Sequence, residues 1–282
     1  MAIWWRAASA AGFSTRSRSR RTGNGLASTA VVRSGPQLGE PTLPLWLPYC
    51  GEAPLPTEWL VRWNPDPVLL AALAGLALAA WRYRDRVRAG YAAAALGVAV
   101  FLFVSPFCAL GSALFTVRIL HDVALAAVLA PLLVAALRLH RTDLPGSPVL
   151  WTALHAMIFW LWHAPPLYAA AMSSDLEFWV MQVTIAGSAA VWWAKVVRAE
   201  APAAAAMLLA TMVSMGALGA LLTFAPRAFY EPHWISARAW GLSALEDQQI
   251  AGIVMWAPAS LVYLLAALAI LYRALGGEKR AA

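Results

Sequence analysis

The sequence predicts an all-α integral membrane protein built as a seven-span helical bundle. Hydrophobic residues make up 61% of the 282 residues, charged residues only 12%, and 15 residues are tryptophan. A soluble domain needs a larger polar shell than this composition supplies. The apolar residues also gather in runs near the roughly 20 residues that cross about 30 Å of hydrocarbon. Both observations place the chain in the lipid bilayer.

Short polar, proline-containing or arginine-containing breaks separate the apolar runs. We expect membrane spans at residues 67–81, 90–115, 119–137, 148–162, 178–194, 202–224 and 250–272. The uninterrupted apolar run of the first span is short, and Trp63 and Arg82 are placed to anchor its two ends at the interface. The alanine-rich start of the sixth span and its VSMGALG stretch suit close helix packing in lipid.

The orientation follows from the basic residues, which accumulate in short cytoplasmic loops. One side of the membrane is rich in them: Arg82, Arg84, Arg86, Arg88, Arg138, Arg141, Lys195, Arg198, Arg273, Lys279 and Arg280. Within residues 46–282, the other side holds only Arg62, Arg118, Arg227 and Arg238. We therefore expect the C-terminus to be cytoplasmic and the N-terminus to be outside.

Residues 1–45 differ from the seven-span membrane domain expected over residues 46–282. Up to Gly39 they contain no acid, and arginines stand among Ser, Thr and Gly without the apolar stretch of a secretory signal. We expect a disordered basic extension. A basic tail outside the membrane conflicts with the charge rule, so a mis-assigned start codon is one alternative. A transit peptide and a tail that binds lipid headgroups are two others.

Few residues have side chains that could bind a metal or take part in chemistry, and most of them lie at the expected outer face. They are Cys50, Cys108, His121, His163, His233 and the acid and amides Asp247, Gln248 and Gln249. The last three stand directly against the apolar run of the seventh span. Burying such groups is costly unless they are paired or lie at the wet interface, which suggests a supporting or gating role. His155 is expected to be a satisfied core residue.

Thiolate and imidazole together suit copper, because soft sulfur selects copper(I) and imidazole binds either oxidation state. We therefore predict Cys50, Cys108, His121 and His163 as metal ligands, with Asp122 orienting His121. Structural alternatives remain open for each. The cysteines could form a disulfide or be small buried residues. His121 and Asp122 could be an interfacial pair, and His163 could end a helix before Pro165.

Several other classes of function are disfavoured. The chain has no phosphate-cradling glycine loop, no nucleotide fingerprint and no zinc-type CxxC pair. The net charge of +7 is distributed as a topology signal, so nucleic acid is not an expected partner.

Four stretches resemble the multi-pass CtaG-type cytochrome c oxidase assembly factor family. They are LTFAPRAFY from Leu222, LEDQQIAGIVMWAPASLVY from Leu245, FWLWHAPPLY from Phe159 and the Trp192–Trp193 pair. The resemblance covers roughly residues 46–274. Its most specific part is the Asp-Gln-Gln run with Gly252, Met255 and Trp256, so Trp256 joins the predicted supporting residues.

This resemblance implies a non-enzymatic protein of the bacterial plasma membrane that helps copper reach the subunits of a haem-copper cytochrome c oxidase. His121 matches a histidine at the start of the third span, and His163 matches the WHxPxxY histidine. Family members often carry a second histidine near the head of the third span, where this chain has Arg118 and Asp122. Cys108 or Cys50 would then have to compensate.

Three other functions compete with copper delivery. A metal-free scaffold for oxidase subunits fits the same family. A copper or haem transporter would use His155 as a step across the bilayer. A haem-carrying electron-transfer enzyme would need two facing histidines, such as His121 and His163.

Overall fold

The computed structural model describes residues 48–281 and the side chains of residues 48–276. Helices form the regular structure, and no strand occurs in this part of the chain. The prediction of an all-helical fold is therefore confirmed. The extension expected over residues 1–45 lies outside the described residues.

Four helical stretches are long and apolar enough to cross a membrane: Phe115–Leu137, Asp175–Arg198, Ala201–Thr223 and Ala244–Gly276. The first joins α4 (Phe115–Ala124), the π-turn η2 (Leu125–Leu129) and α5 (Ala130–Leu137), while the second and third are α8 (Asp175–Arg198) and α9 (Ala201–Thr223). The fourth joins α10 (Ala244–Val254), the π-turn η6 (Met255–Ala259) and α11 (Ser260–Ala281). The chain is thus a helical membrane protein.

A fifth candidate span is a bent pair of helices. The predicted span 90–115 divides into α2 (Ala89–Phe103) and α3 (Pro106–Ala113), which meet at an angle of 44°. Pro106 has no N–H to continue the helix, and it suits the first position of a new one. The Ser105 hydroxyl accepts the Phe107 N–H at 3.2 Å and so caps α3.

Two shorter apolar helices coincide with the remaining predicted spans. They are α1 (Pro67–Arg82) and α6 (Pro148–Trp162), of 16 and 15 residues. At about 1.5 Å per residue they are roughly 22–24 Å long, which is shorter than the hydrocarbon core of about 30 Å. The count of seven spans therefore stays a prediction.

The two π-turns have proline as their common cause. Pro131 follows η2 and Pro258 lies within η6, and each lacks the N–H that a regular helix needs. In η2 the Ala130 N–H bonds to the Leu125 carbonyl, which leaves the Ala126 carbonyl free. The Trp193 indole N–H donates to that carbonyl at 2.8 Å. Trp193 of the Trp192–Trp193 pair therefore satisfies a carbonyl that the π-turn leaves unpaired in a neighbouring helix.

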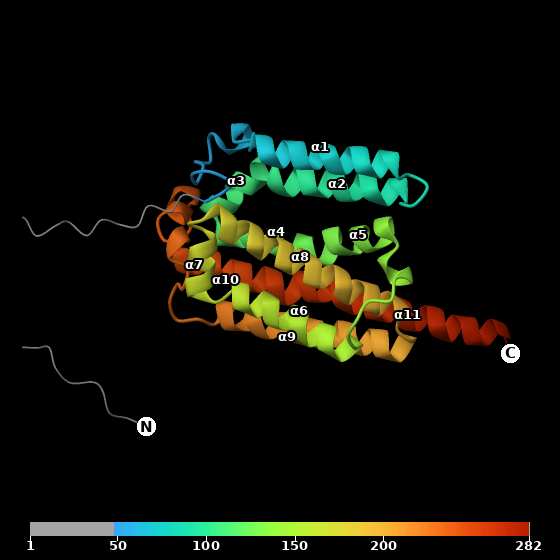
Figure 1. Cartoon of the computed structure of the whole chain (residues 1–282). Helices are drawn as coiled ribbons and strands as arrows, with labels where there is room; N and C mark the ends of the chain where they lie inside the picture. The colour runs from blue at the N-terminus through green and yellow to red at the C-terminus, as the bar shows by residue number, and fades with distance from the viewer. Residues whose placement is uncertain (1–47, 282) are drawn as a thin grey trace, which may run out of the picture. The chain divides into compact units, whose positions relative to one another are not determined.

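The helices run side by side and define two ends of the bundle (Figure 1). α9 packs against α10 and α11, α8 packs against α5 and α6, and α10 packs against α4. One end, which we call the α7 end, carries α3, α7 (Pro165–Ala171) and the start of α10 (Figure 1). The opposite end, which we call the arginine end, carries the α1–α2 loop with Arg82, Arg84, Arg86 and Arg88 (Figure 1).

Two glycines let α9 and α10 touch backbone to backbone. A Cβ atom added to Gly219 would lie 2.7 Å from the Gly252 carbonyl oxygen and 2.8 Å from the Trp256 nitrogen. A Cβ atom added to Gly252 would lie 2.6 Å from the Gly219 carbonyl oxygen. Small residues allow such close approach of helices in lipid, and no larger side chain fits here.

Candidate functional site

The start of α10 carries a carboxylate that caps a different helix. Asp247 accepts the Phe115 N–H at 2.6 Å and the Thr116 N–H at 3.1 Å. These are the first two N–H groups of α4, and Leu114 before them offers no capping side chain. A buried carboxylate there satisfies unpaired donors and matches the positive end of the helix dipole. Asp247 thereby fixes α10 to the start of α4.

Gln248 ties the loop after α9 to α10. Its side-chain carbonyl accepts the Phe229 N–H at 2.7 Å, and its amide donates to the Arg227 and Leu222 carbonyls at 3.2 and 3.4 Å. Gln249 is half-buried and makes no side-chain hydrogen bond to the described residues. In the Asp-Gln-Gln run, Asp247 and Gln248 therefore hold neighbouring segments in place, whereas the Gln249 side chain does not.

The two glutamines give a matched test of this assignment. We expect Gln248→Ala to lower the free energy of unfolding by about 2 kcal/mol, because it leaves a partly buried loop N–H without its acceptor. Gln249→Ala should change it by less than about 0.5 kcal/mol. Thermal unfolding of the two variants in one detergent measures the difference. Equal losses would show that Gln248 is no anchor.

Six buried polar side chains gather at the α7 end, and we call them the polar cluster: Arg118, His121, Asp122, His163, Tyr168 and His233. None is more than 4% exposed. The first three stand at i, i+3 and i+4 of α4, so they share one helix face. The field of Arg118 acts on His121, Tyr168 and His233, and that of Asp122 acts on His163. The cluster is thus one electrostatic unit.

Arg118 connects the cluster to Cys50. Its Nη2 atom lies 4.0 Å from the Cys50 sulfur, and its guanidinium carbon lies 5.1 Å from the centre of the Phe178 ring. Within the described residues, its Nε and Nη1 atoms have no hydrogen-bond partner. A buried cation without such partners is costly, and Asp122 one turn along α4 supplies the opposite charge.

His121 faces two aromatic rings and its own neighbour. The Phe103 and Phe107 ring centres lie 5.1 and 6.3 Å from the imidazole centre. Its Nδ1 atom lies 3.4 Å from an Asp122 carboxylate oxygen, and the orienting role of Asp122 stays a prediction. Neither ring nitrogen makes a hydrogen bond to the described residues. The imidazole is therefore buried with Nδ1 beside Asp122 and with Nε2 free of hydrogen bonds to the described residues.

His163 has a fixed ring orientation. Its Nδ1 atom lies 2.6 Å from the Phe159 carbonyl oxygen, which can only accept, so Nδ1 carries the proton. The Nε2 atom then holds a free lone pair, and it has no partner among the described residues. Histidines that bind metals are commonly fixed in this way through the other nitrogen. The Tyr230 hydroxyl holds the His163 carbonyl at 2.8 Å.

Tyr168 and His233 form a buried pair in the segments outside the predicted spans. The Tyr168 hydroxyl lies 2.7 Å from His233 Nε2. Burial raises the pKa of Tyr168 well above its usual range, so the hydroxyl is the donor. Burial also lowers the pKa of His233 to about 3, which keeps the imidazole neutral and able to accept.

This pair predicts an acid-sensitive fold. Below pH 6.5, the ordinary pKa of histidine, the unfolded chain protonates at His233 while the folded protein does not until about pH 3. Folding stability should therefore fall as the pH drops through that window, by up to about 1.4 kcal/mol per pH unit. His233→Gln keeps a partner for the Tyr168 hydroxyl and does not titrate. The unfolding temperature of this variant should depend less steeply on pH than that of the wild type. The same dependence on pH in both proteins would show that His233 does not cause the acid sensitivity.

Cys50 and Cys108 are joined by a disulfide, with Cα atoms 5.3 Å apart. This is one of the alternatives that the sequence left open. A disulfide sulfur is not a thiolate, so the oxidised pair supplies no strong metal ligand. Within the part of the chain that the structure describes, no group of three or more His, Cys, Asp or Glu side chains is arranged around a metal position. The copper ligand set stays a prediction.

Trp256 lies apart from the polar cluster. It is 44% exposed, it contacts the Phe224 ring with centres 5.7 Å apart, and it covers Gly219. His155 is buried and lies 3.1 Å from the Ser188 hydroxyl, as expected for a satisfied core histidine. The structure thus brings together His121, Asp122 and His163, with Asp247 at the head of α4.

The prediction from sequence omitted Arg118, Tyr168 and His233 as site residues. A signal for Arg118 is present in the sequence, because an arginine, a histidine and an aspartate at i, i+3 and i+4 stand at the head of an apolar run. Tyr168 and His233 are 65 residues apart, and no local pattern links them.

Comparison with known proteins is informative at the level of the family. The family model described as cytochrome c oxidase caa3 assembly factor matches residues 72–276. The chain has no significant match among curated proteins or solved structures. The matched region contains every member of the polar cluster and covers well over half of the chain. The chain therefore belongs to the family of cytochrome c oxidase caa3 assembly factors.

Proposed function

We propose that this protein assists the maturation of a haem-copper cytochrome c oxidase by binding copper(I) transiently at the α7 end and passing it to an oxidase subunit. The observation that carries the proposal is the occurrence of two buried imidazoles, His121 and His163, whose Nε2 atoms have no hydrogen-bond partner in the described residues. Imidazole is a good copper ligand. Copper is cargo in this proposal, and the protein catalyses no reaction of its own.

The disulfide would control the sulfur ligands. A two-electron reduction by an external dithiol, which itself becomes a disulfide, converts Cys50 and Cys108 into two thiols. The guanidinium of Arg118 lies beside Cys50 and favours the thiolate. Thiolate selects copper(I) over harder ions. The reduced protein would therefore hold copper more tightly than the oxidised protein.

The proposed topology places the α7 end outside the cytoplasm of a bacterial cell. It counts α1 and α6 as full spans in addition to the five candidates, which gives seven crossings. The support is the arginine-rich loop between α1 and α2 together with the basic residues after α5 and α8. The C-terminus would then be cytoplasmic, in the plasma membrane.

A metal-free scaffold is the second candidate function. The disulfide and the absence of a three-residue metal cluster among the described side chains favour it. In that case the outer face would hold an oxidase subunit during assembly. The structure lends no support to a transport path through His155, because that ring is stacked on Trp192 and hydrogen-bonded to Ser188.

Complementation separates the two functions. A strain that lacks this gene would be supplied with the wild type, with His121→Ala/His163→Ala, or with His140→Ala as a control at the arginine end. Copper delivery predicts that the double variant is present in the membrane but leaves the oxidase copper-deficient, and that added copper partly restores activity. Full oxidase copper content with the double variant would contradict the proposal.

A further inference from the structure

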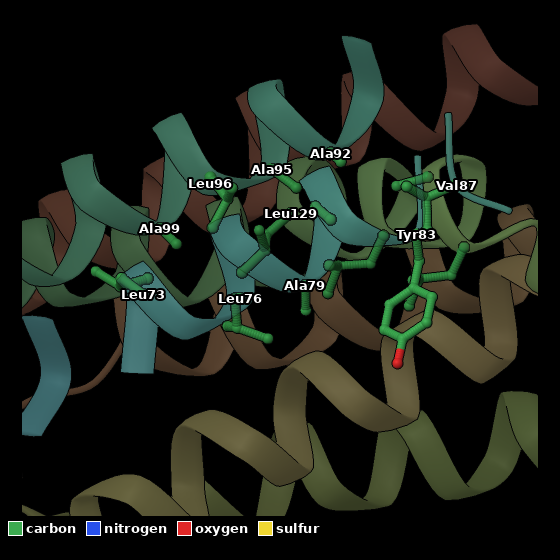
Figure 2. Close-up of a pocket in the computed structure, with 14 residues that line it drawn as sticks. Leu73, Leu76, Ala79, Tyr83, Val87, Ala92, Ala95, Leu96, Ala99 and Leu129 are labelled. Atoms are coloured by element: carbon green, nitrogen blue, oxygen red, sulfur yellow. The ribbon is translucent and has the colours of Figure 1, made fainter. Parts of the chain in front are cut away.

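A cavity lies toward the arginine end, away from the polar cluster. It has a volume of about 360 Å³ and opens between α1, α2 and α5. Figure 2 shows Leu73 and Leu76 of α1 near Leu96 of α2, with Leu129 also lining the space. The volume falls in the range of small-molecule sites, about 300–1,000 Å³. The lining is aliphatic except for Tyr83, so the cavity fits a hydrocarbon.

The cavity has the length of one lipid leaflet. It is lined from Leu73 to Tyr83 along α1. Ten residues of helix rise about 15 Å, and half of the hydrocarbon core is also about 15 Å. The cavity therefore matches the length of a single acyl chain.

Two guanidinium groups stand at the rim of this cavity. The Arg82 and Arg86 guanidinium carbons lie 5.6 and 6.0 Å from the centre of the Tyr83 ring, and Tyr83 lines the cavity. Neither arginine forms an ion pair with any described residue. Asp85 is the one acid in this loop. The Arg88 N–H donates to the Ala136 carbonyl at 2.9 Å, which ties the loop to the opposite rim.

We propose that this groove binds an anionic phospholipid, with one acyl chain between α1, α2 and α5 and the phosphate held by Arg82 and Arg86. The chemistry is complementary at both ends: an aliphatic slot one leaflet deep, and unpaired cations at its mouth. Basic sites between membrane helices commonly recognise anionic headgroups. The site is independent of the copper proposal, because no member of the polar cluster takes part.

Native mass spectrometry of the delipidated protein tests this site. The probes are phosphatidylglycerol and phosphatidylcholine with identical acyl chains. The wild type should bind one phosphatidylglycerol, preferred over phosphatidylcholine by about 30-fold for two arginines near the headgroup. Arg82→Gln/Arg86→Gln should lose most of this preference. Arg227→Gln/Arg238→Gln makes the same charge change on exposed residues elsewhere and should keep it.

A second pair of variants tests the slot for the acyl chain. Ala79 and Ala77 are both exposed residues of α1, but only Ala79 lines the cavity. Ala79→Trp should weaken binding of both lipids at least about tenfold, because it fills the space that the chain would occupy. Ala77→Trp should bind lipid as the wild type does. The proposal is overturned if the wild type shows no preference for phosphatidylglycerol, or if both tryptophan variants bind equally.

Discussion

Replacement of Asp247 by alanine is expected to cause a severe loss of folded protein. The change removes the acceptor of the Phe115 and Thr116 N–H groups and leaves both unpaired at the buried start of α4. Hydrogen bonds to a charged group contribute about 1.5–3 kcal/mol each, so we expect a loss of about 3–5 kcal/mol. That is a large share of the stability of an ordinary protein, about 5–15 kcal/mol. Size-exclusion chromatography and thermal unfolding in detergent measure the outcome.

Two further variants show whether the carboxylate of Asp247 is responsible. Asp247→Asn keeps a single amide oxygen as acceptor, so its stability should lie between those of the wild type and Asp247→Ala. Glu246→Ala is the neighbouring control, since Glu246 is exposed and serves only the capping box of α10. It should cost about 1 kcal/mol. If Asp247→Ala is no less stable than Glu246→Ala, Asp247 does not hold α4 in place.

Replacement of Gly252 by alanine is expected to have an effect of similar size. The new methyl group would lie 2.6 Å from the Gly219 carbonyl oxygen and 2.7 Å from the Thr223 nitrogen, so α9 and α10 must separate. Overpacking of this kind costs about 1–3 kcal/mol, and backbone atoms yield less readily than side chains. We therefore expect a loss of about 3 kcal/mol. The unfolding temperature of Gly252→Ala against the wild type tests it.

A matched glycine should respond in the opposite direction. A Cβ atom at Gly187, within α8, would meet nothing within 4 Å. Alanine is favoured over glycine in helices by up to about 1 kcal/mol, so Gly187→Ala should be neutral or stabilising. Destabilisation of both variants to the same degree would show that α9 and α10 do not depend on the glycine contact.

These variants distinguish residues that hold the α7 end together from residues proposed to bind cargo there. Asp247, Gln248 and Gly252 hold α4, the α9–α10 loop and α9 against α10, and none of them places an unused ligand atom in the polar cluster. His121 and His163 have unused nitrogens and are proposed to bind cargo. Loss of oxidase assembly in an Asp247 variant should therefore track loss of folded protein, whereas His121 and His163 variants should lose function while remaining folded.

The apolar runs of the sequence predict the approximate positions of the long helices, although α4 and α10 begin at Phe115 and Ala244, before the predicted starts at residues 119 and 250. The start of an apolar run can be read from the local sequence without knowledge of distant contacts. For this reason α1, α6 and α9 begin within one residue of their predicted positions. The bend at Ser105 and Pro106 was missed because the run 90–115 stays apolar through the break. The two π-turns were missed for the same reason, because their prolines lie inside otherwise continuous apolar segments.

The candidate site was only partly predictable, because its contacts join distant segments. Asp247 caps a helix 131 residues away, and no local pattern encodes that pairing. Cys50 and Cys108 could be assigned to copper or to a disulfide by residue type alone, and the structure joins them. Arg118 is fully buried within the cluster, although its sequence position indicates only a charge on the outer side and a departure from the family's second histidine.

Copper(I) binding by the purified, reduced protein tests the central claim most directly. The wild type would be compared with Cys50→Ser/Cys108→Ser/His121→Ala and with the control His140→Ala, each checked for intact folding. The account predicts about one copper(I) per chain in the wild type and the control, as for a single site of soft ligands, and none in the triple variant. Absence of copper from the wild type, or equal copper in the triple variant, would contradict it and favour the metal-free scaffold.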